Sequence, residues 1–151
     1  MSEYRELVAK GSTVRLGGKR RKQNTNTQEE EALQRACFIW LDLASGTNEI
    51  LSYAFHPANG GKRSKGEAGK LKAMGVKKGV PDILLPMPWR GYSGLAVELK
   101  SQEGKLTPEQ ADWLDQAKQG GYLTAVCRDL ECFIAVAKNF LAGKKSGAGT
   151  D

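Results

Sequence analysis

The chain has 151 residues, 40% hydrophobic and 26% charged, which is typical of one globular domain. No stretch approaches 18 consecutive apolar residues, which argues against a membrane span, and three cysteines without a CxxC pair argue against a disulfide scaffold. The N-terminal segment lacks the layout of a secretion signal, so we expect a cytoplasmic protein. A net charge of +6 favours a polyanionic partner, nucleic acid first; the alternative is a protein that is merely basic.

The two ends of the chain differ in composition from its middle. Residues 1–26 are rich in Gly, Lys, Arg, Asn and Thr with little periodicity, and we expect a flexible basic arm there. Residues 143–151 (GKKSGAGTD) are expected to form a disordered tail. Residues 27–142 are therefore predicted to form one folded domain.

The first helix is expected over residues 28–44. Thr27 stands where an N-cap would, with Glu30 three residues later at the position of a capping-box partner. Apolar residues then recur at helical spacing, namely Leu33, Cys37, Trp40, Leu41 and Ala44. The next segment, residues 50–55 (ILSYAF), is short and rich in strand formers, and it predicts a strand.

A turn at residues 59–61 and a short helix near residues 68–74 are expected after this strand. Residues 82–85 and 94–100 are apolar runs separated by a loop of turn residues, so they are predicted to pair as an antiparallel hairpin. This hairpin supplies two further strands of the expected sheet.

The next helix has the clearest start signal in the chain. Residues 107–110 (TPEQ) place Thr at the N-cap, Pro at the first helical position and Gln at the third, and Gly120 and Gly121 end the helix. A strand over residues 122–127 and a last helix capped by Asp129 follow. The order α-β-β-β-α-β-α predicts an α/β fold with a central mixed sheet flanked by helices.

Charge is unevenly distributed along the chain. Residues 1–28 contain seven lysines and arginines, and residues 60–79 contain another seven, whereas acidic residues gather in residues 28–31 and 98–115. Two basic segments that flank an acidic cluster predict a phosphate-binding rim around a cation site. The candidates for DNA contact in the second segment are Lys62, Arg63, Lys65, Lys70, Lys72, Lys77 and Lys78.

Acidic residues stand at the predicted ends of the two hairpin strands. Asp82 opens one strand, and Glu98 shares a face of the other with Lys100, because strand side chains alternate. If Asp82 meets Glu98 across the ladder, the two carboxylates repel unless a cation bridges them, and Mg²⁺ or Mn²⁺ is the natural occupant. Lys100 would orient or help to deprotonate a water, or offset phosphate charge. The alternative is an exposed strand with an ordinary i, i+2 charge pair.

Four segments together resemble the VRR-NUC domain, a family of the PD-(D/E)XK nuclease superfamily whose small stand-alone members are often phage-encoded. They are residues 79–82 (GVPD), 98–100 (ELK), 106–110 (LTPEQ) and 120–122 (GGY). The resemblance implies a restriction-endonuclease-like core and metal-dependent hydrolysis of phosphodiesters. It also implies the cytoplasm of a bacterial host if the chain is phage-encoded.

The resemblance carries the family's metal ligands onto Asp82, Glu98 and the backbone carbonyl of Leu99, and its catalytic lysine onto Lys100. Gln110 is expected to be a capping partner within its helix. The alternative is that Gln110 supports the reacting groups near Lys100 without contacting the metal itself.

The family has a glutamate on its first helix, where this chain offers Glu29, Glu30 and Glu31. Glu30 lies on the inward-facing stripe, so we take it as the catalytic residue, meeting the metal directly or through water, with Glu31 in reserve. Gln34 lies one turn further on, as in the family's usual pattern. The alternative is an acidic first turn favoured by the helix dipole, which explains at least two of the three glutamates.

These observations predict a Mg²⁺- or Mn²⁺-dependent DNA endonuclease, selective for branched DNA such as four-way junctions or flaps. Cutting two strands needs two sites, so a homodimer is expected. No P-loop pattern occurs, so no nucleotide cofactor is expected. The alternative is a non-catalytic DNA-binding module on the same fold, which would have lost Asp82, Glu98 or Lys100, whereas all three are present.

Overall fold

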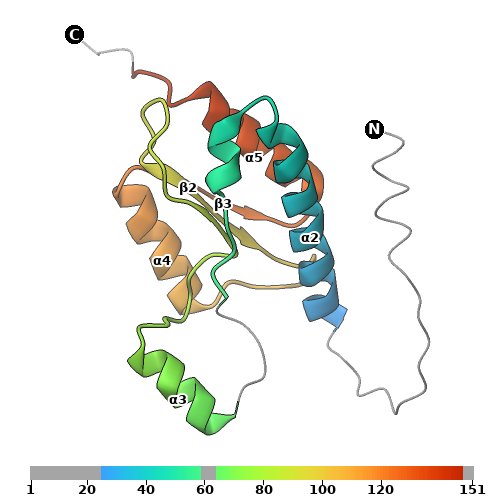
Figure 1. Cartoon of the computed structure of the whole chain (residues 1–151), viewed down its shortest axis with the longest axis vertical. Coiled ribbons are helices and arrows are strands. Elements are labelled where there is room, and N and C mark those ends of the chain that lie inside the picture. The colour runs from blue at the N-terminus through green and yellow to red at the C-terminus, as the bar shows by residue number, and fades with distance from the viewer. Residues whose placement is uncertain (1–24, 59–63, 148–151) are drawn as a thin grey trace.

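The computed structural model describes residues 25–58 and 64–147, which fold into a small mixed sheet between helices (Figure 1). The expected basic arm lies outside the described residues except for its last two positions, and residues 148–151 of the expected tail lie outside them too. In chain order the elements are α2 (Thr25–Ser45), the 3-10 helix η1 (Glu49–Tyr53), α3 (Lys65–Ala73), β1 (Ile83–Leu85), β2 (Gly94–Leu99), α4 (Pro108–Gln119), β3 (Tyr122–Cys127) and α5 (Leu130–Ala142).

The sheet has the strand order β1-β2-β3 in the described part of the chain. The predicted hairpin is confirmed, because β1 pairs antiparallel with β2 and Ile83 stands opposite Val97. Strand β3 pairs parallel with β2 along its whole length, with Leu99 opposite Cys127. The expected α/β fold with a mixed sheet flanked by helices is therefore confirmed.

The strand expected over residues 50–55 is wrong. The chain instead turns through η1, where Leu51 N–H donates to the Asn48 carbonyl at 3.0 Å and Leu51 is 1% exposed. Only Phe55 then pairs, in a single bridge with Leu84. The short i+3 turns directly after α2 allow Leu51 to reach the core, and an extended segment would not reverse the chain so soon.

The first helix also begins earlier than expected. Helix α2 already includes Thr25, so Thr27 lies inside it and is not its N-cap. The other helix signals are confirmed: Thr107 and Gln110 form a reciprocal capping box at α4, and the Asp129 side chain accepts from Cys132 N–H at the start of α5.

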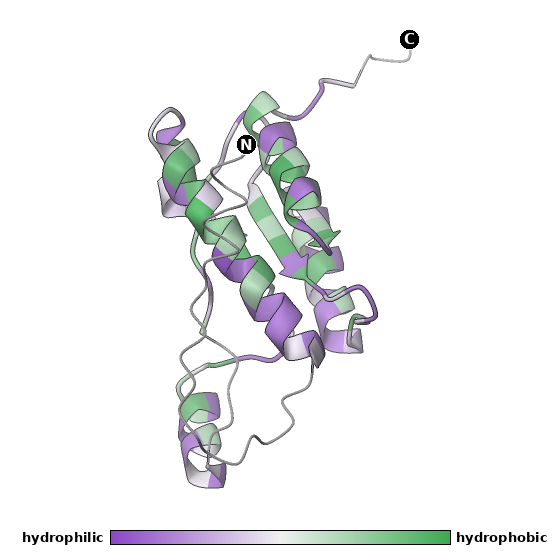
Figure 2. Cartoon of the chain, turned by 90° about the vertical axis from the view of Figure 1, so that its right-hand side faces the viewer, coloured by the Kyte–Doolittle hydropathy of each residue, from purple (hydrophilic) through white to green (hydrophobic). Residues whose placement is uncertain are grey.

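Apolar side chains pack on both faces of the sheet, whose strands are mainly hydrophobic (Figure 2). One face carries Val97 and Leu99 against α2 and α5, where Phe133 and Phe140 are fully buried. The opposite face carries Leu84 and Ala96 against Leu114 of α4. Burial on both faces holds β2 as the rigid centre of the domain.

Helix α3 stands apart from the sheet, at the bottom of Figure 1. The short helix expected near residues 68–74 is confirmed, although it begins at Lys65 after the N-cap Ser64, whose side chain accepts from Glu67 N–H. In the described part of the chain its residues are exposed or half-buried, and Met74 behind it is 72% exposed. No helix among the described residues is long and apolar enough to cross a membrane.

Gly94 at the start of β2 allows the three strands to approach closely. A Cβ at Gly94 would lie 2.7 Å from the Leu85 carbonyl oxygen and 2.5 Å from the Tyr122 ring. We therefore expect Gly94→Ala to lower the free energy of unfolding by about 1–3 kcal/mol in urea denaturation. The control is Gly69→Ala in α3, where a Cβ meets nothing within 4 Å and stability should stay or rise slightly. Equal losses in both variants would contradict this packing.

Candidate active site

Asp82 and Glu98 face each other at one end of the hairpin. Ile83 pairs with Val97 in the antiparallel ladder. The same register places the preceding residue, Asp82, opposite the following one, Glu98. Asp82 Oδ2 accepts a hydrogen bond from Leu99 N–H at 2.8 Å, and the Asp82 carbonyl lies 2.7 Å from His56 Nδ1. Both the side chain and the backbone of Asp82 are therefore held in place.

Glu98 is the most deeply buried charged residue among those described, at 2% exposure. Its Oε1 accepts from Gln110 Nε2 at 2.7 Å and lies 3.3 Å from Lys100 Nζ. Its Oε2 is buried and has no hydrogen-bond partner in the part of the chain that the structure describes. An unpartnered buried carboxylate oxygen is rare in folded proteins and marks a position for a further ligand.

The capping box of α4 aims the Gln110 side chain at Glu98. Gln110 Oε1 accepts from Thr107 N–H at 2.9 Å, while Thr107 Oγ1 accepts from Gln110 N–H at 3.2 Å. The amide nitrogen of Gln110 is thereby left to donate to Glu98. The helix cap and the support of Glu98 are two roles of one side chain.

Lys100 lies just beyond β2 and is 8% exposed. Its backbone N–H donates to the Cys127 carbonyl at 3.0 Å, which continues the pairing of β2 with β3 by one residue. The ammonium is therefore fixed beside Glu98, on the same face of the strand.

Of the three glutamates early in α2, Glu30 reaches this site. Glu30 is half-buried and its Oε1 accepts from Ser101 N–H at 3.2 Å, whereas Glu29 and Glu31 are exposed. Gln34, one turn further on, is half-buried, and no hydrogen bond joins it to the site carboxylates among the described residues.

Burial and mutual repulsion dominate the electrostatics of the carboxylates. Burial raises the pKa of Glu98 from 4.5 to about 7, and the charge on Asp82 adds to this shift, whereas Lys100 opposes it. Burial also raises the pKa of Asp82, while the Leu99 N–H lowers it and the charge on Glu30 raises it. One ammonium thus faces three carboxylates in a poorly hydrated place, an arrangement that a divalent cation stabilises.

The donor set suits a hard cation that is held only partly by the protein. Asp82, Glu98 and the Leu99 carbonyl offer oxygen ligands, as Mg²⁺ and Mn²⁺ prefer, and Glu98 Oε2 is unpartnered among the described residues. No group of three His, Cys, Asp or Glu side chains in residues 25–58 and 64–147 is arranged to hold an ion by itself. Water or phosphate oxygens would have to complete the coordination, as is usual for Mg²⁺.

Two supporting residues escaped the sequence analysis. Ser101 is 3% exposed and donates its N–H to Glu30, and its position directly after Lys100 was the only signal for it. Arg128 donates to backbone carbonyls of residues 101, 102 and 104. Nothing in the local sequence around Arg128 points to that contact.

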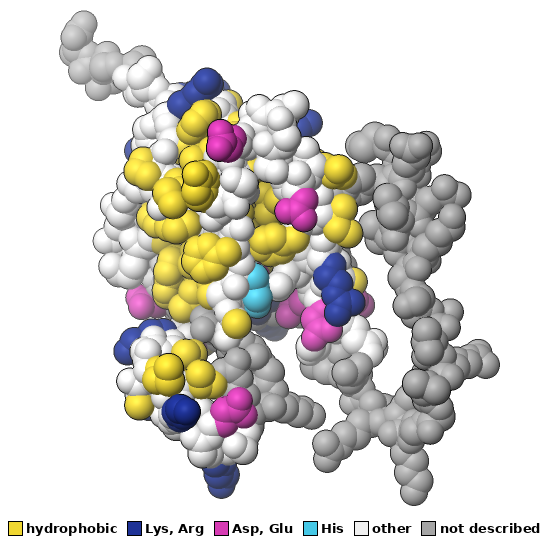
Figure 3. Space-filling model, viewed as in Figure 1, with side chains coloured by type: hydrophobic (Ala, Val, Ile, Leu, Met, Phe, Trp, Pro, Cys, Tyr) yellow, Lys and Arg dark blue, Asp and Glu magenta, His cyan; other side chains and the backbone are white. Residues whose placement is uncertain are grey.

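Figure 3 shows basic side chains on different sides of α3, at the lower left of the view. Lys65, Lys70 and Lys72 are exposed on α3, and Lys77 and Lys78 are exposed in the segment that leads to Asp82. Lys62 and Arg63 lie outside the described residues. The described lysines are accessible to a polyanion, whereas Glu98 is buried.

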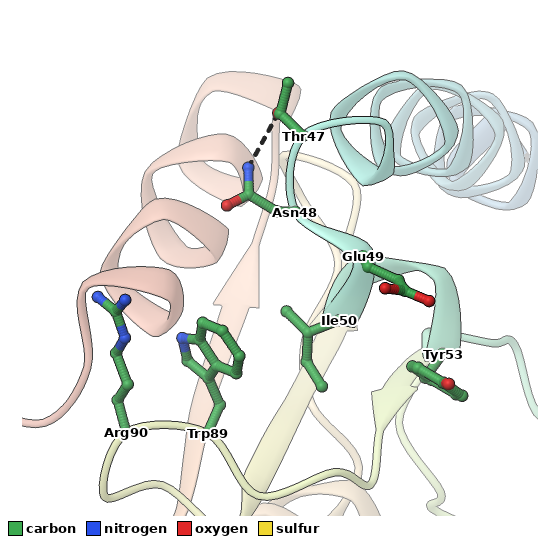
Figure 4. A pocket seen from close by; sticks show the side chains of 7 residues that line it. All are labelled: Thr47, Asn48, Glu49, Ile50, Tyr53, Trp89 and Arg90. Atoms are coloured by element: carbon green, nitrogen blue, oxygen red, sulfur yellow. Dashed lines mark hydrogen bonds between the residues drawn. The ribbon is translucent and has the colours of Figure 1, made fainter.

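An open pocket lies at the other end of the hairpin (Figure 4). Its volume is about 550 Å³, and it is lined by Thr47, Asn48, Glu49, Ile50, Tyr53, Trp89 and Arg90. Trp89 and Arg90 belong to the loop that joins β1 to β2, whereas Asp82 precedes β1 and Glu98 is near the end of β2. The pocket is therefore distinct from the acidic site.

The sequence matches the VRR-NUC domain over residues 28–129, which is more than half of the chain and includes Glu30, Asp82, Glu98 and Lys100. The chain belongs to the VRR-NUC family. A solved structure of a VRR_NUC domain protein has the same fold, with a TM-score of 0.60 and 24% identity over 75% of this chain and 88% of that one. No curated protein shows significant similarity to the chain. The VRR-NUC match makes this a nuclease-type domain, and the acidic site lies within the matched segment.

The raised pKa of Glu98 predicts a pH-dependent stability of the metal-free protein. Between about pH 4.5 and 7 the folded state binds a proton that the unfolded state releases, so stability falls as pH rises through this window. We expect Glu98→Gln to remove this loss, which reaches about 3 kcal/mol above pH 7. Thermal unfolding in EDTA from pH 5 to 8 measures it, with Glu103→Gln on the exposed loop as the control. Parallel pH profiles for wild type and Glu98→Gln would contradict the burial argument.

Proposed function

We propose that this protein is a Mg²⁺- or Mn²⁺-dependent DNA endonuclease. The observation that carries the proposal is the buried Glu98 carboxylate, whose Oε2 is unpartnered among the described residues, opposite Asp82 and beside Lys100 in a nuclease-type domain. Asp82, Glu98 and the Leu99 carbonyl would hold the cation, and Glu30 would contact it directly or through water. When bound, the cation would polarise the scissile phosphate and lower the pKa of the attacking water.

The side chains around the cation would have separate tasks. Lys100, held 3.3 Å from Glu98 Oε1, would orient the attacking water or stabilise charge on the phosphate. Gln110 occupies Glu98 Oε1 and so directs the other oxygen toward the ligand. Burial of Glu98 and Lys100 keeps bulk water away and strengthens these interactions.

DNA would be held by the exposed lysines around α3. A flexible cation on an exposed surface suits the phosphate backbone, whose contacts are electrostatic and independent of sequence. The segment that carries Lys77 and Lys78 continues directly into Pro81 and Asp82, so a phosphate bound there lies along the path to the carboxylates. These contacts would position the scissile bond as well as add affinity.

Branched DNA is the substrate class that we propose, with two copies of the chain acting together in the cytoplasm. The described part of one chain offers one acidic site, and symmetric cutting of a four-way junction needs two sites with matching symmetry. A flap needs only one cut. Comparison of flap and junction cleavage therefore tests both whether two copies act together and which DNA structure is preferred. A non-catalytic DNA-binding module has no use for a buried Lys100 beside Glu98, which favours the enzyme.

Asp82→Asn and Glu98→Gln are expected to reduce cleavage by at least about 100-fold, because each removes a charge that holds the cation. Lys100→Met should reduce turnover comparably with little change in DNA affinity, since one phosphate contact among many contributes little to binding. Labelled linear, flap and four-way-junction DNAs with Mg²⁺, Mn²⁺ or EDTA measure this, and Glu131→Gln, at an exposed position of α5, is the matched control. Wild-type rates in either carboxylate variant would show that the site is assigned wrongly.

The lysines around α3 should govern the salt dependence of binding. Neutralising Lys70, Lys72, Lys77 and Lys78 to Gln is expected to reduce the slope of log affinity against log salt by about 0.9 for each phosphate that the protein no longer neutralises. Cleavage should also fall below wild type at saturating DNA, because the scissile phosphate is no longer positioned. The control neutralises Lys118 and Lys138, which are exposed on α4 and α5. Full turnover of the α3 variant at saturating DNA would show that these lysines add affinity but do not position the scissile phosphate.

A further inference from the structure

The loop that follows β2 is held to the end of β3 by one arginine. Arg128 Nη1 donates to the backbone carbonyls of Ser101, of Gln102 at 3.2 Å and of Gly104 at 2.8 Å. Gln102 Nε2 donates in return to the Arg128 carbonyl at 3.3 Å. A guanidinium that donates to three carbonyls of one turn fixes the shape of that turn.

This loop, residues 101–104, is connected both to Lys100 and to Glu30 of the acidic site. Its first residue follows Lys100 directly, and the Lys100 N–H donates to the Cys127 carbonyl, one residue before Arg128. The Ser101 N–H donates to Glu30 Oε1 on α2 at 3.2 Å. In Figure 1 the loop leaves the end of β2 beside α2 and returns to α4. The loop thus relates the glutamate of α2 to the residues of the hairpin.

The loop is packed closely around the Glu30 carboxylate. A Cβ at Gly104 would lie 2.9 Å from Ser101 Oγ and 3.1 Å from Glu30 Oε1, tighter than ordinary packing. Ser101 Oγ is itself buried and unpartnered among the described residues. Because the packing is this close, a small displacement of the loop would move the Ser101 N–H and, with it, the Glu30 carboxylate to which it donates.

We propose that Arg128 is a positioning residue of the nuclease reaction. It holds the loop closed and thereby fixes the Glu30 carboxylate relative to Lys100 and Glu98. The proposal rests on the proposed function, because Glu30 matters for catalysis only if the site cleaves DNA. Outer groups that orient catalytic carboxylates are commonly worth about 10- to 100-fold in activity.

Hydrogen exchange tests the structural part without any need for catalysis. Arg128→Ala should increase exchange of the Ser101 and Gly104 amides at least about 10-fold, with the remaining chain and the melting temperature close to wild type. Gly104→Ala perturbs the same contact from the opposite side and should act alike, whereas Lys138→Ala on α5 is the control. Unchanged exchange of these amides in both loop variants would overturn the proposal.

Kinetics test the catalytic part. Arg128→Ala should reduce kcat about 10- to 100-fold with the KM for DNA nearly unchanged, and Arg128→Lys should restore part of the loss. In a Glu30→Gln background, Arg128→Ala should reduce kcat less than about twofold, because Arg128 acts through the Glu30 carboxylate, which the first substitution has already removed. A raised KM with unchanged kcat, or fully additive losses, would make Arg128 a phosphate contact or a general stabiliser. A wild-type protein without nuclease activity would contradict the proposed function, while the exchange result would still decide whether Arg128 closes the loop.

Discussion

The buried carboxylate of Glu98 is the interaction on which the rest of the site depends. A charged group at 2% exposure is stable only if its oxygens have partners, and Gln110 and Lys100 both serve one of the two oxygens. The helix cap of α4, the pairing of β2 with β3 and the approach of Asp82 all place groups around it. The other oxygen is unpartnered in the described residues, and the cation that we propose would give it a partner.

One face of β2 carries apolar side chains that stabilise the fold, and the other carries the charged side chains of the candidate site. Val97 and Leu99 pack into the large cluster with α2 and α5, and Glu98 and Lys100 lie on the alternate face, toward α4. The hydrophobic face can hold the strand rigid while the polar face carries repulsive charges. A site of this kind lowers the stability of the folded state, and the packed core behind it offsets that cost.

Elements with local signals could be predicted from the sequence, and those decided by distant contacts could not. The TPEQ cap, the hairpin and the strand over residues 122–127 each follow from neighbouring residues and are confirmed. Residues 50–55 have strand propensity, but burial of Leu51 after α2 imposes a 3-10 turn. Helical spacing singled out Glu30, which the structure places at the site, whereas the contacts of Arg128 depend on a loop far away in sequence. The cation and the preferred DNA structure remain predictions.

In the proposed function, different charged groups would bind DNA and cleave it. Glu30, Asp82 and Glu98 face one ammonium, so the site by itself repels a phosphate. If the protein binds DNA as proposed, the attraction would come from the exposed lysines around α3, which carry the opposite charge. A cation held by the carboxylates would reverse the sign of the site and let the phosphate approach. On the proposed mechanism, DNA would be bound without being cut until the cation and the phosphate meet at Glu98.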